Sequence, residues 1–395
     1  MSVTARRTIC FVLVPLLLVA ALGLVALGGV WSFLTPIPYD TPTQLASVPL
    51  PNGPSSLAWS PDGSYVAAGA WGANGETNPG EVLVVDVAKG SVLITLKGKS
   101  WVEGLTFSPD GNWLAVAARP SIPVGGEPAE LVVFDVPAFT ARFTAKARVP
   151  DGGFIDLAWS ADSKSLYAID GPVDYAPGAA EVRRWAVPAF TEHQHAIRAT
   201  QDRAFTALAA SPDGRTLAIA ERIRLPRVVR MIRLFNLGEG TERLSFKAGD
   251  DIEGTRLGFT PDGKSVGVLE GKGISWWDLT TGHTVKPGVA RFASQPAGMS
   301  YIRSWNSVSP DGGWQARGYE RHRGFGDLGW DNRDKEFGTF IDVTERATAK
   351  TRTWRVSKVQ LDSPAVAFSP DGSKLAGAVK QPGGASTLIF WAVPK

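Results

Sequence analysis

Short apolar runs with interspersed polar positions recur along the chain from residue 55 onward. A tetrapeptide, Ser-Pro-Asp-Gly or Thr-Pro-Asp-Gly, separates pairs of these runs, and a degenerate copy, Ser160-Ala161-Asp162-Ser163, takes the place of one. Its Asp falls at positions 62, 110, 162, 213, 262, 311 and 371. Pro presets a type I turn, Asp bonds to local backbone, and Gly adopts the left-handed conformation that returns the chain. Each copy therefore predicts two antiparallel strands joined by a tight turn.

Each unit continues with a third apolar run, and most units have a fourth that is more polar. The third runs begin at Glu81, Glu130, Glu181, Arg230, Gly273, Gly338 and Thr387. Fourth runs begin, for example, at Ser91 and Lys350. Seven such units of about 50 residues predict an all-β fold over residues 55–395, a seven-bladed β-propeller of four-stranded antiparallel blades.

The last unit reaches Pro394 and Lys395 directly after its third run. We expect its fourth strand to come from residues 45–50, which have the sequence LASVPL. This pairing closes the ring without an unpaired seam. Pro49 suits an outer edge strand, because an absent backbone N–H is harmless there.

The units resemble the WD-repeat family of propellers. The resemblance covers residues 41–395 and rests on the turn after an apolar strand and on aromatic–Asp ends of third strands, as in Trp277-Asp278. The chain departs from the family because no Gly-His pair precedes its first strands, and Ala186 and Ala392 replace the third-strand Asp. Bacterial periplasmic propellers of the Tol type look equally similar.

The resemblance implies a non-catalytic scaffold that binds protein partners. The alternative is an enzyme or a binder of a small ligand or metal, since some similar propellers are lactonases or lyases. Its site would lie at the channel mouth, where carboxylates would have to converge. Glu103, Asp156 and Glu253 open first strands and are the acids placed to do so.

An uncharged apolar run, residues 8–34, precedes the repeats and follows Arg6 and Arg7. As a helix it would be about 40 Å long, which exceeds the roughly 30 Å hydrocarbon core of a membrane. It predicts a transmembrane signal anchor with residues 1–7 in the cytoplasm and the propeller outside. The alternative is a cleaved signal peptide with its site at residues 26–28, which would leave a secreted protein.

Between the anchor and the propeller, residues 35–54 hold six prolines and predict an extended stalk that contains the closing strand. Trp31 and Tyr39 suit the aromatic belt at a membrane interface. The excess of Arg over Lys and the many Ala and Gly residues indicate a bacterial source.

Charge and composition exclude several classes of function. The formal net charge of +3 gives no field for nucleic acid. The single cysteine, Cys10, excludes an internal disulfide framework and a thiolate zinc cluster. His193 and His195 share one face of a predicted outer strand, but no further ligand stands nearby. We therefore expect a monomeric propeller with no catalytic residue, cofactor or metal.

The links between second and third strands are long and open on one face of a propeller, which is typical of a binding surface. The alternative is tolerated drift of insertions. In the fourth unit, Arg222, Arg224 and Arg227 suit an acidic protein, an anionic polysaccharide or a lipid headgroup. The alternative there is a solvated edge balanced by Asp250, Asp251 and Glu253.

The sixth unit carries the strongest candidate, the link within residues 319–338. It mixes aromatic and guanidinium side chains, which are enriched at interface hot spots: Arg321, Arg323, Phe325, Trp330 and Arg333. Trp71, in the link of the first unit, is the other tryptophan expected at a binding surface. The tryptophans at repeat positions are expected in the blade cores: Trp59, Trp159, Trp185, Trp277 and Trp391.

Overall fold

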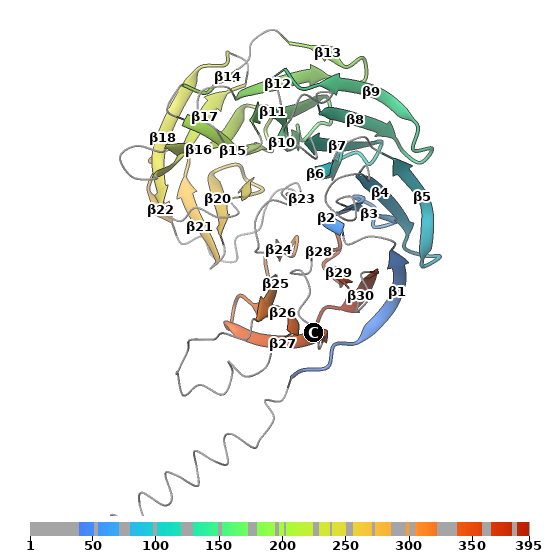
Figure 1. The fold of residues 1–395 in the computed structure, drawn as a ribbon. Coiled ribbons are helices and arrows are strands. Elements are labelled where there is room, and N and C mark those ends of the chain that lie inside the picture. The colour runs from blue at the N-terminus through green and yellow to red at the C-terminus, as the bar shows by residue number, and fades with distance from the viewer. Residues whose placement is uncertain are drawn as a thin grey trace, which may run out of the picture.

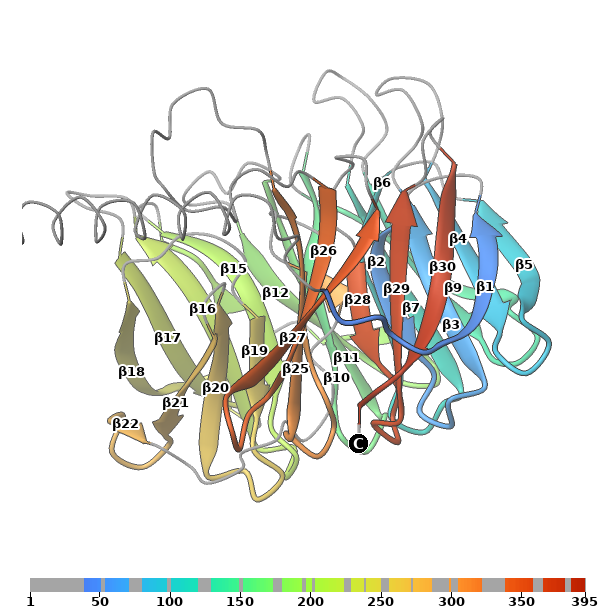
Figure 2. The ribbon, with the colours of Figure 1, turned by 90° about the horizontal axis from the view of Figure 1, so that it is seen from below.

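The computed structural model describes eighteen segments of the chain: residues 39–50, 54–70, 80–97, 101–119, 129–148, 152–172, 180–193, 197–200, 203–223, 229–237, 239–249, 256–270, 273–285, 298–299, 305–321, 338–357, 365–380 and 385–394. Within them, seven antiparallel sheets form a ring around a central channel (Figure 1). In the side view the strands run between the two faces of the ring (Figure 2). The predicted propeller of seven blades is confirmed.

The first four blades follow the chain in order. Blade 1 holds β2 (Pro54–Trp59), β3 (Tyr65–Ala70), β4 (Glu81–Asp86) and β5 (Ser91–Lys97). Blade 2 holds β6 (Trp101–Phe107), β7 (Trp113–Arg119), β8 (Glu130–Asp135) and β9 (Ala141–Lys146). Blade 3 holds β10 (Gly152–Trp159), β11 (Ser165–Pro172), β12 (Glu181–Ala186) and a divided outer strand, β13 (Thr191–Glu192) and β14 (Ile197–Arg198). Blade 4 holds β15 (Arg203–Ala210), β16 (Thr216–Ile223), β17 (Val229–Asn236) and β18 (Glu242–Gly249).

The remaining blades complete the circle. Blade 5 holds β19 (Arg256–Phe259), β20 (Ser265–Glu270), β21 (Gly273–Asp278) and β22 (Thr284–Val285). Blade 6 holds β24 (Trp305–Val308), β25 (Trp314–Arg321), β26 (Gly338–Glu345) and β27 (Lys350–Ser357). Blade 7 holds β28 (Ala365–Phe368), β29 (Lys374–Lys380), β30 (Ser386–Ala392) and β1 (Gln44–Leu50). A further short strand, β23 (Gly298–Met299), pairs with β6.

The ring is closed by a strand from the other end of the propeller sequence. β1 pairs antiparallel with β30, so the segment predicted at residues 45–50 is the fourth strand of blade 7. Pro49 stands opposite Thr387 on this outermost strand, as expected for an edge position. Val48 and Leu50 are each 2% exposed and pack in a core shared by blades 7 and 1.

Part of the predicted stalk belongs to the propeller. The Asp40 backbone N–H donates to the carbonyl of Thr353, and the Tyr39 ring lies 5.4 Å from the Phe340 ring, both on blade 6. Tyr39 therefore packs on the propeller instead of standing free for a membrane interface. Residues 1–7 and the anchor predicted at 8–34 lie outside the described residues. Across the described segments, no helix is long and apolar enough to cross a membrane.

The repeated tetrapeptide builds the same hydrogen-bonded turn seven times. In each turn the Ser or Thr hydroxyl donates to the Asp carboxylate and accepts from a backbone N–H five residues later. The turn glycines have φ between +66° and +76°, and Ser163 takes the same region at +58° in the degenerate copy. These bonds favour the ionised Asp, and the Ser369 hydroxyl lowers the pKa of Asp371 to about 2.

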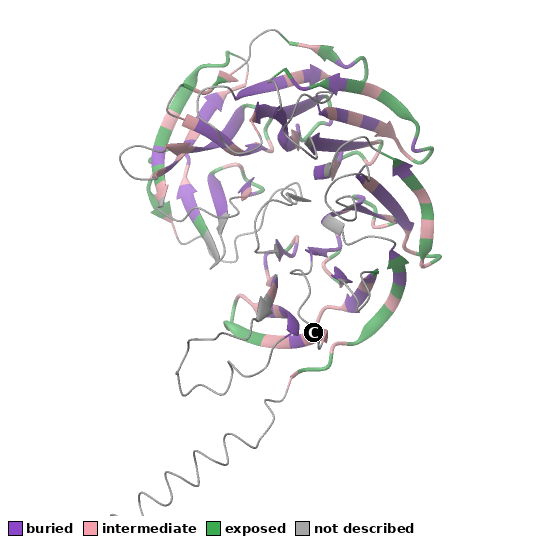
Figure 3. Ribbon diagram, viewed as in Figure 1, coloured by how far each residue is buried: buried purple, intermediate pink, exposed green. Residues whose placement is uncertain are grey.

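The blades pack through their faces, and burial decreases from the channel outward, where exposed positions alternate along the outer strands (Figure 3). Trp59, Trp159, Trp185, Trp277 and Trp391 are all buried, as expected. Two of them also join neighbouring blades. The Trp59 indole donates to the carbonyl of Ala367 in blade 7 at 3.0 Å, and the Trp159 indole donates to that of Thr106 in blade 2 at 3.3 Å.

A β-bulge interrupts the innermost strand of blades 1 to 4, at the same place in each. The register shifts between Pro54 and Ser56, Val102 and Gly104, Phe154 and Asp156, and Phe205 and Ala207. A bulge bends its strand and increases the local twist. The inner strands therefore change direction at one level of the channel.

Candidate functional site

Most of the residues predicted to bind a partner lie outside the described residues. They are Arg323, Phe325, Trp330 and Arg333 of the sixth unit, Trp71 of the first, and Arg224 and Arg227 of the fourth. Arg321 ends β25 and Arg222 lies near the end of β16, where the long links of these two blades begin. Their role in binding stays a prediction. His193 follows β13 and is exposed, and His195 lies outside the described residues.

The arginines near the fourth-unit link are partly engaged within the blade. Arg233 in β17 pairs with Glu221, which is fully buried, and its second amino group lies 2.6 Å from Glu242. The other Glu221 oxygen lies 2.8 Å from Arg203. Arg233 is thus neutralised by acids of its own blade. Asp250, Asp251 and Glu253, which we expected to balance this cluster, lie outside the described residues.

Blade 3 repeats this arrangement at equivalent positions. Arg183 in β12 lies 3.0 Å from Asp170 in β11. Arg183 is 6% exposed and Asp170 is fully buried. Its Nε and Nη2 donate to the two carboxylate oxygens of Glu192 at 2.9 Å. Its guanidinium also stacks 4.8 Å above the Trp185 ring, as that of Arg233 does over Phe235. We call each set of inner acid, arginine and outer glutamate an arginine triad.

The arginine triad of blade 3 is also tied to blade 2. Arg148, which follows β9, lies 2.8 Å from both Glu181 and Glu192, and its backbone N–H donates to Asp170 at 2.9 Å. Burial raises the pKa of Asp170, and these donors oppose that rise. The sequence itself carries a signal for the triads. In both blades the arginine stands two residues before the third-strand aromatic and nine before the outer glutamate.

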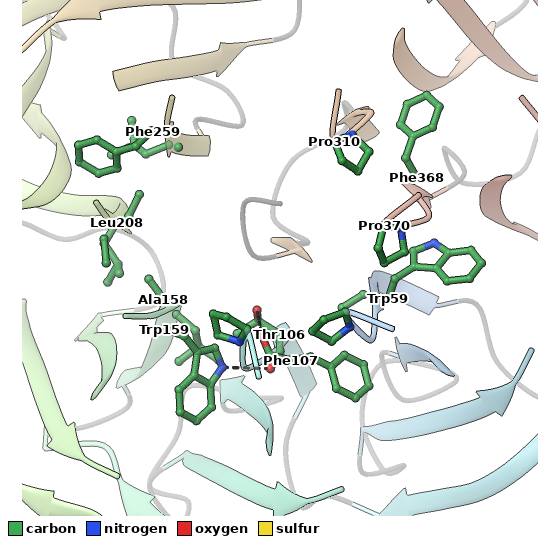
Figure 4. Close-up of a pocket in the computed structure, with 18 of the residues that line it drawn as sticks. Trp59, Thr106, Phe107, Ala158, Trp159, Leu208, Phe259, Pro310, Phe368 and Pro370 are labelled. Carbon is green, nitrogen blue, oxygen red and sulfur yellow. Dashed lines mark hydrogen bonds between the residues drawn. The ribbon is translucent and has the colours of Figure 1, made fainter. Parts of the chain in front are cut away.

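The mouth of the channel on the side of the tight turns is an apolar cavity of about 340 Å³ (Figure 4). The ends of the inner strands supply small and aromatic side chains, and the turns supply prolines. Its lining includes Ala58, Trp59, Phe107, Ala158, Trp159, Phe259, Phe368, Pro61, Pro109, Pro310 and Pro370. The bonded indoles of Trp59 and Trp159 fix two of the rings in place.

The inner strands also carry charged side chains. Asp156 and Glu103 are 4% and 3% exposed, and Arg256 of blade 5 interacts with Asp156 through its charge. The Asp156 carboxylate accepts the N–H of Leu208 at 2.8 Å and so joins the inner strands of blades 3 and 4. Of the acids expected at the channel mouth, Asp156 and Glu103 are therefore buried, and Asp156 joins two blades. Glu253 lies outside the described residues. In the described part of the chain, no group of three His, Cys, Asp or Glu is arranged to hold a metal.

Stability is expected to depend on pH through Asp156. Burial raises its pKa to about 7, against the pull of two backbone N–H groups and Arg256, and burial also lowers the pKa of Arg256 to about 10. Because the pKa of Asp156 is higher in the folded state, the folded protein holds this proton more tightly than the unfolded chain. The resulting stabilisation is complete below the pKa of the unfolded chain, near 4, and is lost as the pH rises through about 7. Between pH 5 and pH 8, the wild type should lose about 2–3 kcal/mol of unfolding free energy relative to Asp156→Asn.

Urea unfolding of both proteins at the two pH values measures this difference. Asp213→Asn is the matched control, because hydrogen bonds from Ser211 and backbone overcome the effect of burial and lower the pKa of Asp213. That variant should keep the pH dependence of the wild type over this range. Parallel curves for wild type and Asp156→Asn would contradict the assignment.

Comparisons with known proteins agree with this architecture. A sequence model described as "WD domain, G-beta repeat" matches residues 47–75 and 90–120. Each match begins at the outermost strand of one blade and continues into the next. The "Small ribosomal subunit protein RACK1" of Candida albicans is 34% identical over 115 residues, which is 29% of this chain and 33% of that protein. The chain thus matches about a third of the length of this relative.

Two solved structures share the fold. The β-propeller domain of Cps50 (Swd1) from Myceliophteria thermophila superposes with a TM-score of 0.58 at 12% identity, over 90% of this chain and all of that one. A chain of the Mitotic Checkpoint Complex superposes with a TM-score of 0.58 at 16% identity, over 91% of this chain and 96% of that one. The protein is a seven-bladed β-propeller, and residues 47–75 and 90–120 of it match the WD40 repeat model.

Proposed function

We propose that this propeller is a non-catalytic platform that binds protein partners on the extracytoplasmic side of a membrane. The observation that carries the proposal is the apolar lining of the channel mouth on the turn side. Alanine, leucine, proline and fixed aromatic rings make a pocket that suits the buried apolar side chains at the centre of protein interfaces. The names of two similar proteins, a ribosomal subunit protein and a checkpoint complex, also refer to assemblies.

The opposite face of the ring supports the same proposal. The second strands of the blades end there, and the long links of the first, fourth and sixth units leave from these ends. A rigid scaffold with long loops on one face is a common design for binding. We propose the sixth-unit link, with Arg321, Arg323, Phe325, Trp330 and Arg333, as the main contact.

The membrane location rests on the sequence. The uncharged run at residues 8–34 follows Arg6 and Arg7, and the next basic residue is Lys89. This asymmetry favours a cytoplasmic N-terminus and a propeller outside. The anchor would hold the propeller close to the membrane, since the chain joins blade 6 already at Tyr39.

Affinity purification of the tagged full chain from its native host tests the proposal. Membranes are first washed with alkaline carbonate, where an anchored protein stays in the pellet and a secreted one is released. Detergent extracts of wild type, of a deletion of residues 321–336 and of a deletion of residues 72–79 are then compared. The second deletion is the matched control, because it shortens another link between a second and a third strand.

We expect wild type and the control to retain a protein partner that the deletion of residues 321–336 loses. Equal partner sets for all three proteins would exclude the sixth-unit link as the contact. Recovery of the wild type without any stoichiometric partner would contradict the platform itself.

A further inference from the structure

One strand of the structure lies inside the ring and not in the body of a blade. β23 (Gly298–Met299) stands within the circle of inner strands (Figure 1). It pairs antiparallel with β6 of blade 2, with Gly298 opposite Leu105 and Met299 opposite Gly104, and it also contacts β2 of blade 1. In sequence, β23 falls between blades 5 and 6. β23 therefore pairs with a blade that is distant from both of its neighbours in the sequence.

The place where β23 pairs is distinctive in the sequence. Six residues before the turn Asp, the residue varies among the seven inner strands and alanine alone occurs twice: Ser56, Gly104, Asp156, Ala207, Arg256, Trp305 and Ala365. Blade 2 alone has glycine there, and a glycine in a strand often marks the close approach of another backbone. Among the described inner strands, only β6 pairs with another strand, β23, on the edge that faces the channel. The bulge between Val102 and Gly104 bends the strand just before the pairing begins.

The edge of β6 leads directly into the apolar cavity. Thr106 and Phe107, the residues after Leu105, line that cavity together with Trp59 and Trp159. The pairing is antiparallel, so residues that precede the position of Gly298 would lie opposite the residues that follow Leu105. A longer strand in the same register would therefore run past Thr106. Its backbone would pair with β6, and its side chains would enter a pocket of about 340 Å³.

We propose that the channel edge of β6 is an acceptor site for an extended apolar peptide segment of a partner, and that β23 is a built-in competitor for it. Strand addition supplies backbone hydrogen bonds for any sequence, and the cavity selects apolar side chains. A partner segment that extends the pairing past Thr106 would add contacts with the side chains that line the cavity. This site is separate from the long links, so the proposal goes beyond the partner of the opposite face and does not depend on it.

A disulfide tests whether β23 occupies the site. The full chain, purified in detergent with Cys10→Ser, receives Gly104→Cys and Met299→Cys. Opposed residues of antiparallel strands have Cα atoms about 4.5–5.5 Å apart, within the range of a disulfide. We expect mild oxidation to link this pair. Ala207→Cys with Met299→Cys is the matched control, at the same repeat position in blade 4, and should stay reduced. Failure of the first pair, or equal linking of both, would overturn the assignment of β23.

Peptide binding tests the competition. The probe is a fluorescent peptide of residues 295–302, Gln-Pro-Ala-Gly-Met-Ser-Tyr-Ile. Met299→Pro disrupts the pairing of β23, because proline cannot donate a backbone hydrogen bond. We expect this variant to bind the probe at least about tenfold more tightly than the wild type, in which β23 fills the site. Ser294→Pro, outside β23, should behave as the wild type.

Disulfide cross-linking also tests where the probe binds. A probe with cysteine in place of its methionine should form a disulfide with Gly104→Cys when Met299→Pro is also present, and not with Ala207→Cys. Equal affinity of wild type and Met299→Pro, or no binding to either, would overturn the acceptor site. If Met299→Pro does not fold, the chain with Cys10→Ser, Gly104→Cys and Met299→Cys gives the same comparison in its oxidised and reduced forms. Only the reduced form should exchange with the probe.

Discussion

Val48→Ala together with Leu50→Ala should lower the free energy of unfolding by about 3–6 kcal/mol. Both side chains are 2% exposed and pack between blades 7 and 1, against residues such as Leu57 and Leu388. Removal of these side chains leaves cavities beside β1, the N-terminal strand that completes blade 7 and closes the ring. Single domains are stable by about 5–15 kcal/mol, so a loss of this size would approach the whole margin.

Leu45→Ala is the matched control for this prediction, since Leu45 lies on the same strand and is 50% exposed. It should change stability by less than about 0.5 kcal/mol. Urea unfolding followed by tryptophan fluorescence measures all three proteins. Equal small effects of the double substitution and of Leu45→Ala would show that β1 adds little to closure of the ring.

Arg183→Leu is expected to cost about 3–5 kcal/mol. The guanidinium is 6% exposed and lies against Asp170, which is fully buried, so its loss strands a carboxylate away from water. Among the described residues, the backbone N–H of Arg148 would remain as a donor to Asp170. The variant also loses the stacking on Trp185 and both bonds to Glu192.

Two further variants separate charge burial from packing. Arg148→Met removes an arginine that pairs with the same Glu192 but is 52% exposed, and it should cost at most about 1 kcal/mol. Asp170→Leu combined with Arg183→Leu removes both buried charges and should recover much of the loss. Equal costs for Arg183→Leu and Arg148→Met would show that the buried pair contributes no more than an exposed one.

The repeat made the architecture readable from the sequence. The turn needs a hydroxyl, an Asp and a residue that tolerates positive φ, and these requirements are local, so they recur as a visible tetrapeptide. The third strands begin where the apolar runs predicted, for example at Glu81 and Glu130. The closing strand at residues 45–50 followed from counting strands and from the cost of an open edge.

The candidate sites were less readable, because their residues come from different strands and different units. Asp170, Arg183 and Glu192 meet only when three strands align, and Arg148 joins them from the neighbouring blade. For the same reason the run of arginines in the fourth unit does not show that Glu221 holds Arg233 within the blade. Asp156 was expected to point to the channel mouth and is instead a buried link to blade 4.

The sequence by itself thus determined the number of blades, their strand order and the residue that turns each hairpin, since each depends on a few neighbouring residues. Only the tertiary structure decided which charges are buried together, what lines the channel and which strand enters it. Those features depend on the distance between inner strands across the ring and on the register between blades. β23 illustrates the difference, because nothing in Gly298-Met299 points to Gly104, and only the closed ring brings the two backbones together.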